Sequence, residues 1–273
     1  MGKLGYKIFS FSYSSIYLYP YIWELVMRYL ITFSYDGSKF HGYQIQPGLR
    51  TVQQELEKAA SYINNQQYTS VQSSGRTDKG VHALNQSAHF ELEKEIPLDK
   101  LKRALNSNLP EDIHISKVEK VDSEFHARFC TKKKEYVYKI NMGEYDPLTR
   151  KYIYQYNRNL DIDKMKEAIE YFKGTHDFSS FVSSEDIREN KVRTIYETKI
   201  SLKKDILEIS FQADGFMKYQ VRNMVGLLIT IGSGKKEPNS VLEIISAKDR
   251  KKAPKTAPAE GLYLKKVWYK WKK

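Results

Sequence analysis

The chain has 273 residues, and its 45 Lys and Arg against 33 Asp and Glu leave a formal net charge of +12. A hydrophobic fraction of 41% is enough to form a packed core, so the composition excludes a chain that is disordered throughout. The single cysteine, Cys130, excludes a disulfide framework and a zinc site of several thiolates, and it indicates a reducing, cytoplasmic compartment. The charge favours an anionic partner, either a nucleic acid or an anionic membrane surface.

Residues 1–27 differ from the rest of the chain, because they are rich in aromatic side chains, poor in charge and without a clear period. Serines, Pro20 and Glu24 interrupt them, so the segment is too polar for a membrane-spanning helix of about 20 apolar residues. We interpret the segment as a leader that adds little to the fold. The alternative is an arm or strand that packs on the body of the protein.

From Arg28 onward, strands and helices are expected to alternate. Strands are predicted at residues 29–35, 71–73, 87–92 and 113–118, with helices after Thr51 and after Pro97. Thr51 and Gln54 have capping-box spacing, which predicts that the Thr51 hydroxyl caps the first of these helices.

A similar pattern recurs in the second half. Strands are predicted at residues 136–142, 194–202, 206–213 and 261–271, and helices at 163–172, 221–231 and 240–247. This recurrence predicts an α+β protein of two related domains, each a mostly antiparallel sheet with helices packed on one face. The expected division is residues 28–124 and 130–273, with residues 1–27 as an extension.

Chemically distinctive residues are densest in the segment SSGRTDKGVHALNQSAHF, residues 73–90. Gly75 and Gly80 bracket an acid, Asp78, that stands between basic residues, and glycines permit sharp turns and close approach of a ligand. Neighbouring positive charge is expected to favour the ionised carboxylate, which can act as a nucleophile, a base or a metal ligand. The alternative is an ordinary surface turn.

Several other kinds of chemistry lack support in the sequence. The six histidines show no spacing typical of a helical metal site, so no metal is expected, and His82 and His89 are interpreted as polar residues in or beside the core. There is no Walker lysine motif, no G-x-G-x-x-G and no G-x-S-x-G. Cys130 is predicted to be a small core residue rather than a nucleophile.

Basic residues are interleaved with aromatic ones. Lys132–Lys134 lead directly into Tyr136 and Tyr138, and such a combination can bind phosphates and stack on bases of RNA. The alternative is a solvated, lysine-rich face. Arg222 begins an otherwise apolar helix, so it is expected to require an anionic partner unless it points to solvent, and Asp78 is a candidate.

Eight segments together carry a resemblance to a known family. They are YDGSKFHGYQIQ (35–46), TVQQELEKA (51–59), GRTDKGVHA (75–83), FHARF (125–129), KEYVYKI (134–140), HDFSSF (176–181), VRNMVG (221–226) and EGLYL (260–264). In this order they resemble the tRNA pseudouridine synthase A family over residues 28 to about 269.

The resemblance implies an enzyme that isomerises uridine to pseudouridine in the anticodon stem-loop of tRNA, at positions 38 to 40. It implies no cofactor, no metal and no ATP. It also implies a homodimer with each active site in a basic cleft between the two α+β halves.

Site residues follow from the resemblance position by position. Asp78 matches the catalytic nucleophile, and Arg76 matches an arginine thought to help hold the target base out of the stack. Tyr136 matches the tyrosine that packs on the uracil ring, and Arg222 the arginine that pairs with the aspartate. Thr77, within the same motif, is expected to contribute to substrate binding.

The chain departs from the usual family pattern at four neighbouring positions. Tyr43 stands where a Trp is common, Ser74 where an Ala is common, Lys79 where a small residue is frequent, and Gln220 where a Met is common. None of these changes removes a catalytic group.

Two alternative functions remain from the residues alone. One is a non-catalytic RNA-binding protein on the same scaffold. The other is a membrane-associated protein anchored through residues 1–27.

Overall fold

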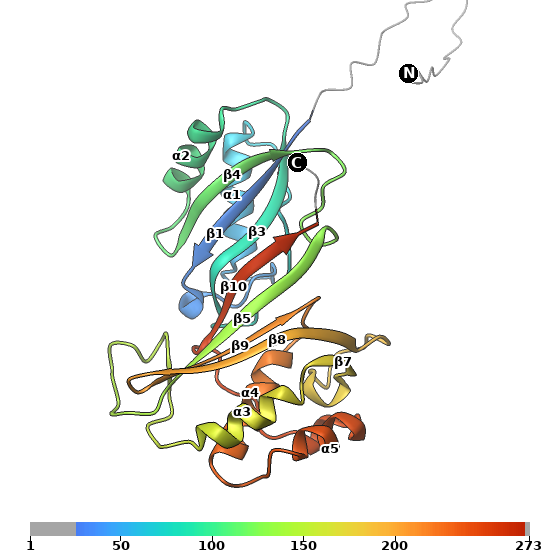
Figure 1. Cartoon of the computed structure of the whole chain (residues 1–273). Helices are drawn as coiled ribbons and strands as arrows, with labels where there is room; N and C mark the ends of the chain where they lie inside the picture. Colours follow the sequence, from blue (N-terminus) through green and yellow to red (C-terminus); the bar gives the residue numbers. More distant parts are fainter. Residues whose placement is uncertain (1–25, 271–273) are drawn as a thin grey trace, which may run out of the picture.

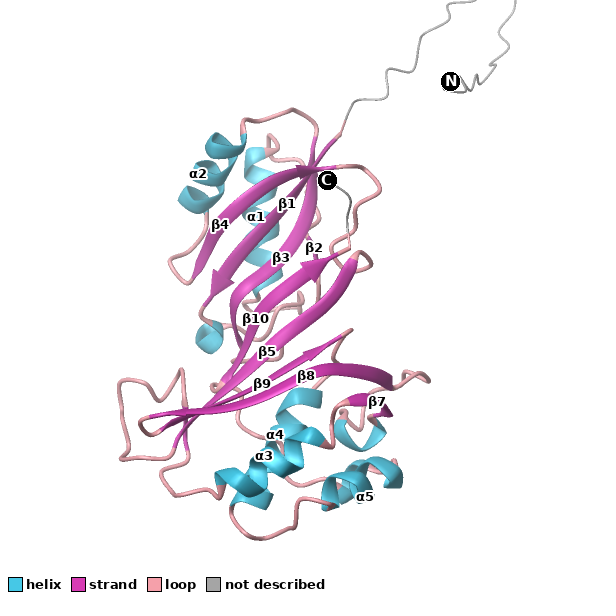
Figure 2. Cartoon of the chain, in the orientation of Figure 1, coloured by secondary structure: helices cyan, strands magenta, loops and turns pink. Residues whose placement is uncertain are grey.

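The computed structural model describes residues 26–270, so the interpretation of the N-terminal extension as leader, arm or membrane anchor concerns residues that lie, up to residue 25, outside the described part. The predicted α+β class is confirmed, since one large sheet carries helices in two groups (Figures 1 and 2). Within residues 26–270, no helix is long and apolar enough to cross a bilayer.

The strands occupy both halves of the chain. They are β1 (Met27–Tyr35), β2 (Gln72–Ser73), β3 (His82–Leu92), β4 (Ile113–Val121), β5 (Thr131–Asn141), β6 (Tyr154–Gln155), β7 (Gly174–Asp177), β8 (Val192–Lys203), β9 (Ile206–Ala213) and β10 (Leu262–Tyr269). The α-helices are α1 (Val52–Ile63), α2 (Leu98–Asn108), α3 (Ile162–Glu170), α4 (Gln220–Gly232) and α5 (Ser240–Ala247). Three 3-10 turns complete the described elements, at Gly37–Lys39, Ser179–Phe181 and Arg250–Lys252.

The two halves share one continuous sheet of order β4-β1-β3-β10-β5-β9-β8-β7. The last strand, β10, makes this junction, because it pairs parallel with β3 on one side and antiparallel with β5 on the other. Most remaining ladders are antiparallel, as predicted. The division at residues 28–124 and 130–273 stays a prediction.

Both helix groups pack on the same face of the sheet. The residues Tyr35, Ala83, Leu264, Tyr136 and Phe211 are paired in register across five strands. All five are buried in one hydrophobic cluster that also contains the inner faces of the helices. Residues paired directly across strands point to the same side. The helices therefore flank a stretch of sheet between the two halves, where β3, β10 and β5 meet (Figure 1).

The predicted cap of α1 is wrong. The side chain of Thr51 accepts no capping hydrogen bond and is fully buried. Instead, the carbonyl oxygens of Gly42 and Tyr43 accept from the backbone N–H groups of Val52 and Gln53, at 3.3 and 2.9 Å. The first N–H groups of a helix need acceptors, and here a neighbouring loop supplies them in place of the cap side chain. The helix is thereby joined to the loop that contacts the candidate site.

Helix α4 packs very closely on the segment before β10. A Cβ atom added at Gly226 would lie 2.2 Å from the carbonyl oxygen of Lys255. The same segment holds the first turn of the helix, because the Ala257 N–H donates to the Arg222 carbonyl oxygen at 3.1 Å. Gly226 is thus needed for the approach that positions Arg222.

Gly226→Ala is accordingly expected to destabilise the protein, although alanine favours helices. Overpacking against backbone costs about 1–3 kcal/mol, which outweighs the gain of up to about 1 kcal/mol in helix propensity. For a chain of this size we expect a fall in Tm of a few °C in thermal unfolding. Gly215→Ala is the control, because its Cβ would meet only Arg193 Nε at 3.8 Å. An equal loss of stability in both variants would contradict this account of α4.

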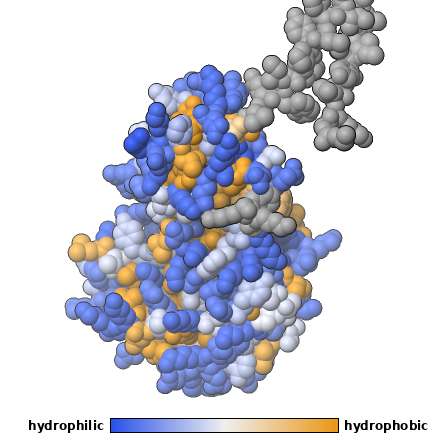
Figure 3. Space-filling model, turned by 45° about the horizontal axis from the view of Figure 1, so that its top comes forward, coloured by the Kyte–Doolittle hydropathy of each residue, from blue (hydrophilic) through white to orange (hydrophobic). Residues whose placement is uncertain are grey.

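The surface in Figure 3 is mostly hydrophilic, and its hydrophobic residues form several separate groups. This agrees with a basic chain that carries 29% charged residues.

Candidate active site

The candidate site is built on the loop between β2 and β3, residues 74–81. Gly80 has φ +78°, in the left-handed region that favours glycine. The backbone N–H of Tyr43 donates to the Thr77 carbonyl oxygen at 3.1 Å, and Gly42, with φ +94°, comes so close that a Cβ there would be 2.9 Å from that oxygen. The loop that carries Asp78 is therefore clamped by the segment that precedes α1.

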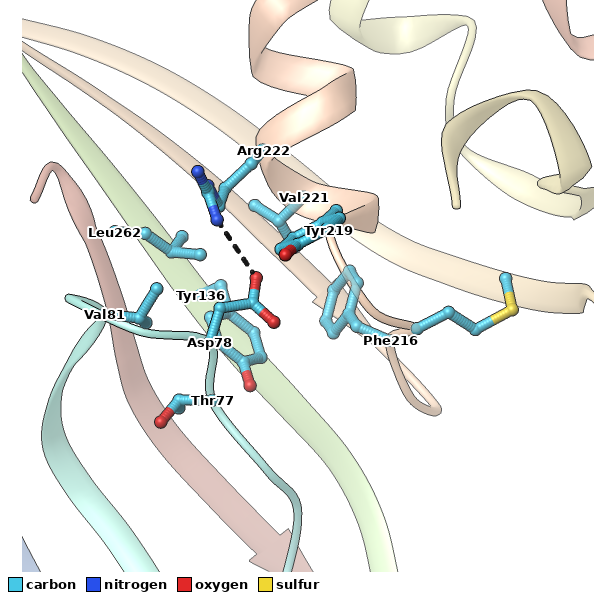
Figure 4. A pocket seen from close by; sticks show the side chains of 10 residues that line it. Thr77, Asp78, Val81, Tyr136, Phe216, Tyr219, Val221, Arg222 and Leu262 are labelled. Carbon is cyan, nitrogen blue, oxygen red and sulfur yellow. Dashed lines mark hydrogen bonds and ion pairs between the residues drawn. The ribbon is translucent and has the colours of Figure 1, made fainter. Parts of the chain in front are cut away.

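Asp78 meets Arg222 across the two halves of the chain, as predicted. Arg222 Nη1 donates to Asp78 Oδ2 at 3.3 Å (Figure 4). Arg222 Nε donates to the Ala257 carbonyl oxygen at 2.8 Å. The side chains of Arg222 and Asp78 are only 15% and 19% exposed. The guanidinium also lies over the Tyr219 ring, 5.1 Å from its centroid. These contacts leave the guanidinium little freedom to turn away from the carboxylate.

The electrostatic expectation for Asp78 needs a correction. Burial raises the pKa of this carboxyl above its ordinary value, and the charges of Arg222 and Lys218 only partly oppose that effect. The sequence neighbours Arg76 and Lys79 are exposed and are not among the charges that shift this pKa. The positive field at Asp78 thus comes from residues about 140 positions away in the sequence.

Tyr136 forms the floor beside Asp78, on the helix-bearing face of β5. Its side chain is 7% exposed, and its ring packs edge-on against Phe216 with centroids 5.2 Å apart. Figure 4 shows Tyr136 behind Asp78, with Phe216 beside it. Burial, with lesser effects of Tyr35 and Asp78, raises the pKa of Tyr136 far above its ordinary value. The phenol therefore stays protonated at neutral pH.

The other two predicted site residues have different surroundings. Thr77 is buried, and its hydroxyl forms a hydrogen bond of 2.8 Å with Tyr35 OH. Arg76 is exposed, forms no ion pair within residues 26–270, and does not line the cavity. The structure thus brings together Asp78, Thr77, Tyr136 and Arg222, and leaves the Arg76 side chain in solvent.

A small cavity lies between these residues, with a volume of about 40 Å³. Its lining comes from both halves: Thr77, Asp78, Val81, Tyr136, Phe216, Met217, Tyr219, Val221, Arg222 and Leu262. This volume holds a few water molecules rather than a nucleobase. A base can enter only if side chains at the rim move.

The buried side-chain amide of Gln86 holds the Asp78 loop through hydrogen bonds. Gln86 is 0% exposed, and its Oε1 accepts from the Ser74 hydroxyl at 2.6 Å and from the Ser87 N–H at 3.0 Å. Its Nε2 donates to the Gly75 carbonyl oxygen at 2.9 Å. Ser74, which stands where the family commonly has Ala, thus has a hydrogen-bonding role here.

Sequence reasoning missed Gln86, Phe216 and Tyr219. The sequence gives little signal for Tyr219. Its backbone is left-handed before α4, with φ +65°, but Tyr is not a residue type that indicates this conformation. Gln220, which stands where a Met is common, is fully buried, and its Oε1 accepts from the Met217 N–H at 3.0 Å.

The remaining candidates behave as polar core residues. His82 and His89 are 2% and 5% exposed, and each Nδ1 accepts from a backbone N–H, of Gly37 and Ala127 respectively. Cys130 is half-buried and packs against a small cluster around Phe125. No group of three or more His, Cys, Asp or Glu in the described part of the chain is arranged to hold a metal ion.

Comparison with known proteins now adds independent support. A family model described as tRNA pseudouridine synthase matches residues 31–130 and 168–270. Proteins named tRNA pseudouridine synthase A are similar over almost their whole length. One from Geobacillus sp. (strain WCH70) is 45% identical over 89% of this chain and 98% of its own. Those from Latilactobacillus sakei and Bacillus licheniformis are 41% and 46% identical, over 90% and 89% of this chain and 100% and 99% of theirs.

The site is a small cavity lined by both halves, and the matched segments identify the chain as an RNA-modifying isomerase. The chain belongs to the tRNA pseudouridine synthase family. The resemblance seen in the sequence is thereby confirmed, and tRNA is the class of substrate.

Proposed function

We propose that this enzyme isomerises uridines at positions 38 to 40 of the tRNA anticodon stem-loop, with Asp78 as nucleophile. The observation that carries the proposal is the half-buried ion pair of Asp78 and Arg222, which lines one cavity with the Tyr136 ring. A protein that only binds RNA has no need of a carboxylate in such a place, because Asp78 repels phosphates and its pKa is raised by burial.

The reaction breaks the N1–C1′ bond of uridine, turns the base over, and forms a C5–C1′ bond. The C5 proton is lost and N1 gains a proton, so the product is an isomer. The Asp78 carboxylate can attack either C6 of uracil or C1′ of the ribose, and it is released unchanged in the last step. No external energy source or redox partner enters this balance, which fits the expectation that no cofactor is used.

Arg222 favours the ionised form of the nucleophile and fixes its orientation. The guanidinium is fixed to the Ala257 carbonyl oxygen, so its Nη1 remains near Asp78 Oδ2. A fixed positive charge in a partly dry site stabilises a carboxylate more than solvent-exposed charge does.

Tyr136 supports the base as a neutral ring. Its raised pKa disfavours a phenolate, so stacking and hydrogen bonding by the neutral phenol are the roles that the site supports. Thr77, on the same loop as Asp78, lies where it can contact the entering nucleotide.

Entry of the base requires both flipping and widening of the cavity. Unstacking a base costs a few kcal/mol, and the exposed guanidinium of Arg76 is free to hold the flipped state from outside the cavity. Phe216 and Tyr219, both half-buried at the rim, are the side chains that we expect to move. The proposal includes a homodimer, which rests on the family resemblance, and a cytoplasmic location, which rests on the single cysteine.

The direct test uses purified enzyme and unmodified tRNA transcripts with tritium at C5 of uridine. Pseudouridine formation replaces that hydrogen, so tritium is expected in water without any added cofactor. Intact tRNA binding with no release from several tRNAs would instead support the non-catalytic RNA-binding alternative.

Two substitutions of Tyr136 distinguish the contribution of its ring from that of its hydroxyl group. Tyr136→Leu is expected to weaken substrate binding by about 1–3 kcal/mol, because a stacked base loses its aromatic partner. Tyr136→Phe should retain that binding and keep the packing on Phe216. The affinity of both variants for an anticodon stem-loop decides the point, and equal affinities would exclude stacking as the role of the ring.

A further inference from the structure

Lys134, a lysine outside the cavity lining, contacts the loop that carries Asp78. Lys134 is two residues before Tyr136 on β5, so both side chains point to the same face of the sheet. Its Nζ donates to the Ser74 carbonyl oxygen at 2.5 Å. A Cβ at Gly75 would lie 2.8 Å from Nζ, so the first glycine of the loop makes room for this ammonium.

The charge of Lys134 is not balanced by a carboxylate. Within residues 26–270 no Asp or Glu forms an ion pair with it, whereas Lys218 pairs with Glu185 at 3.0 Å and Arg222 with Asp78 at 3.3 Å. Burial lowers the pKa of Lys134 to about 8, and repulsion from Arg128 and Arg193 adds to this effect. The positive charges that act on Lys134 come from the linker before β5 and from β8.

Such a place is suited to an anion. An ammonium has three N–H donors, and the Ser74 carbonyl occupies one of them. A partly buried cation that is repelled by its neighbours gains more from an anionic oxygen than a solvated surface lysine does. The anion that a tRNA substrate brings to this loop is the phosphodiester.

We propose that Lys134 is a phosphate-binding residue, whose ammonium binds a phosphodiester oxygen of the RNA strand beside the flipped uridine. The two side chains leave β5 about 7 Å apart along the strand, a span comparable with one nucleotide. Tyr136 would then support the base while Lys134 holds the adjoining backbone. The proposal rests on the proposed function in one respect, namely that the target strand lies beside the Asp78 loop.

Three variants of the full-length enzyme test the proposal. Lys134→Met removes the charge but keeps the length of the side chain, and Lys134→Arg keeps the charge. Lys133→Met is the matched control, since it removes the same charge from the opposite face, where Lys133 Nζ donates to Gln212 Oε1 at 2.7 Å.

Binding of an anticodon stem-loop RNA is measured against salt concentration. Lys134→Met should lower affinity about 10-fold or more, as for loss of a charge-assisted hydrogen bond. The slope of log affinity against log salt should become shallower by about 0.7–0.9, as for loss of one phosphate contact. Lys134→Arg should keep most of the wild-type slope. A reduced kcat with an unchanged salt slope in Lys134→Met would overturn the proposal and leave only a loop-holding role.

Single methylphosphonate substitutions in the RNA identify the phosphate. One position next to the target uridine should weaken binding to the wild-type enzyme but not to Lys134→Met, because the two changes remove the same contact. Additive losses at every position would overturn the phosphate site. Coupling at one position without tritium release from any tRNA would support the phosphate site while contradicting the proposed reaction, so the two failures are distinguishable.

Discussion

Asp78→Asn is expected to abolish pseudouridine formation, with a loss of about 10³-fold or more in single-turnover rate. Asparagine has nearly the same shape but supplies no anionic oxygen to attack the substrate. The hydrogen bond to Arg222 remains possible, so the cleft should keep its geometry. Tritium release from C5-labelled tRNA measures the rate, and filter binding of the same tRNA measures affinity, which should change little.

The stability of this variant serves as its control. Because the folded-state pKa of Asp78 is raised, the folded protein is penalised for ionised Asp78 once the pH exceeds the ordinary carboxyl value. Below that value the penalty vanishes. Asn removes it at pH 7, although Arg222 then loses a charged partner. We expect a Tm close to that of the wild type or above it. A strongly destabilised variant would mean that lost activity reflects unfolding, and a variant that retains activity would exclude Asp78 as nucleophile.

Arg222→Gln is expected to lower kcat/KM about 10²-fold at neutral pH, in line with the loss of a fixed charge from an active site. Without the guanidinium, burial acts on Asp78 unopposed except by Lys218, so the pKa of Asp78 rises further. The reaction needs the ionised carboxylate, and activity therefore increases as the pH rises through this pKa. The acid limb of the kcat/KM profile should move to higher pH in the variant.

Arg222→Lys is the conservative comparison for this effect. It keeps a positive charge near Asp78 but cannot bond both Ala257 and Asp78 with one planar group. Its acid limb should lie between those of the wild type and Arg222→Gln. An acid limb that is unchanged in Arg222→Gln would show that Arg222 does not control the ionisation of Asp78.

The residues that the sequence identified are those whose signals are local or that the family motifs contain. Asp78 stands in a glycine-bounded loop, and Arg222 is a charge in an apolar helix. Each can therefore be identified as a candidate without any knowledge of the fold. Their contact at 3.3 Å confirms the inference that Arg222 needs an anionic partner. The prediction that flanking basic residues supply the positive field at Asp78 was wrong. Basic residues next to it in the sequence can point to solvent, while distant ones point toward it.

What the sequence missed depends on contacts between distant segments. In the sequence, Lys134 is one lysine in a run of three. Only the fold brings its ammonium to the carbonyl oxygen of Ser74, which is 60 residues away in the chain. The joining of both halves into one sheet needs the parallel pairing of Tyr263 with His82, which no local pattern encodes.

Strand boundaries show the same limit. β3 begins at His82 rather than at the predicted residue 87, although the intervening Asn85 disfavours a strand. β5 begins at Thr131 rather than at 136, through a lysine run. In both cases pairing with β10 extends the strand, because ladder hydrogen bonds override weak intrinsic preference.

The most direct test of the account compares wild-type enzyme and Asp78→Asn on one tRNA transcript with tritium at C5 of its uridines, and on the same transcript with cytidine at positions 38 to 40. We expect tritium release by the wild type from the first transcript only, and none by Asp78→Asn from either. Release from the substituted transcript would contradict the assignment of target positions. Release by Asp78→Asn at the wild-type rate would contradict the central claim that Asp78 carries the reaction.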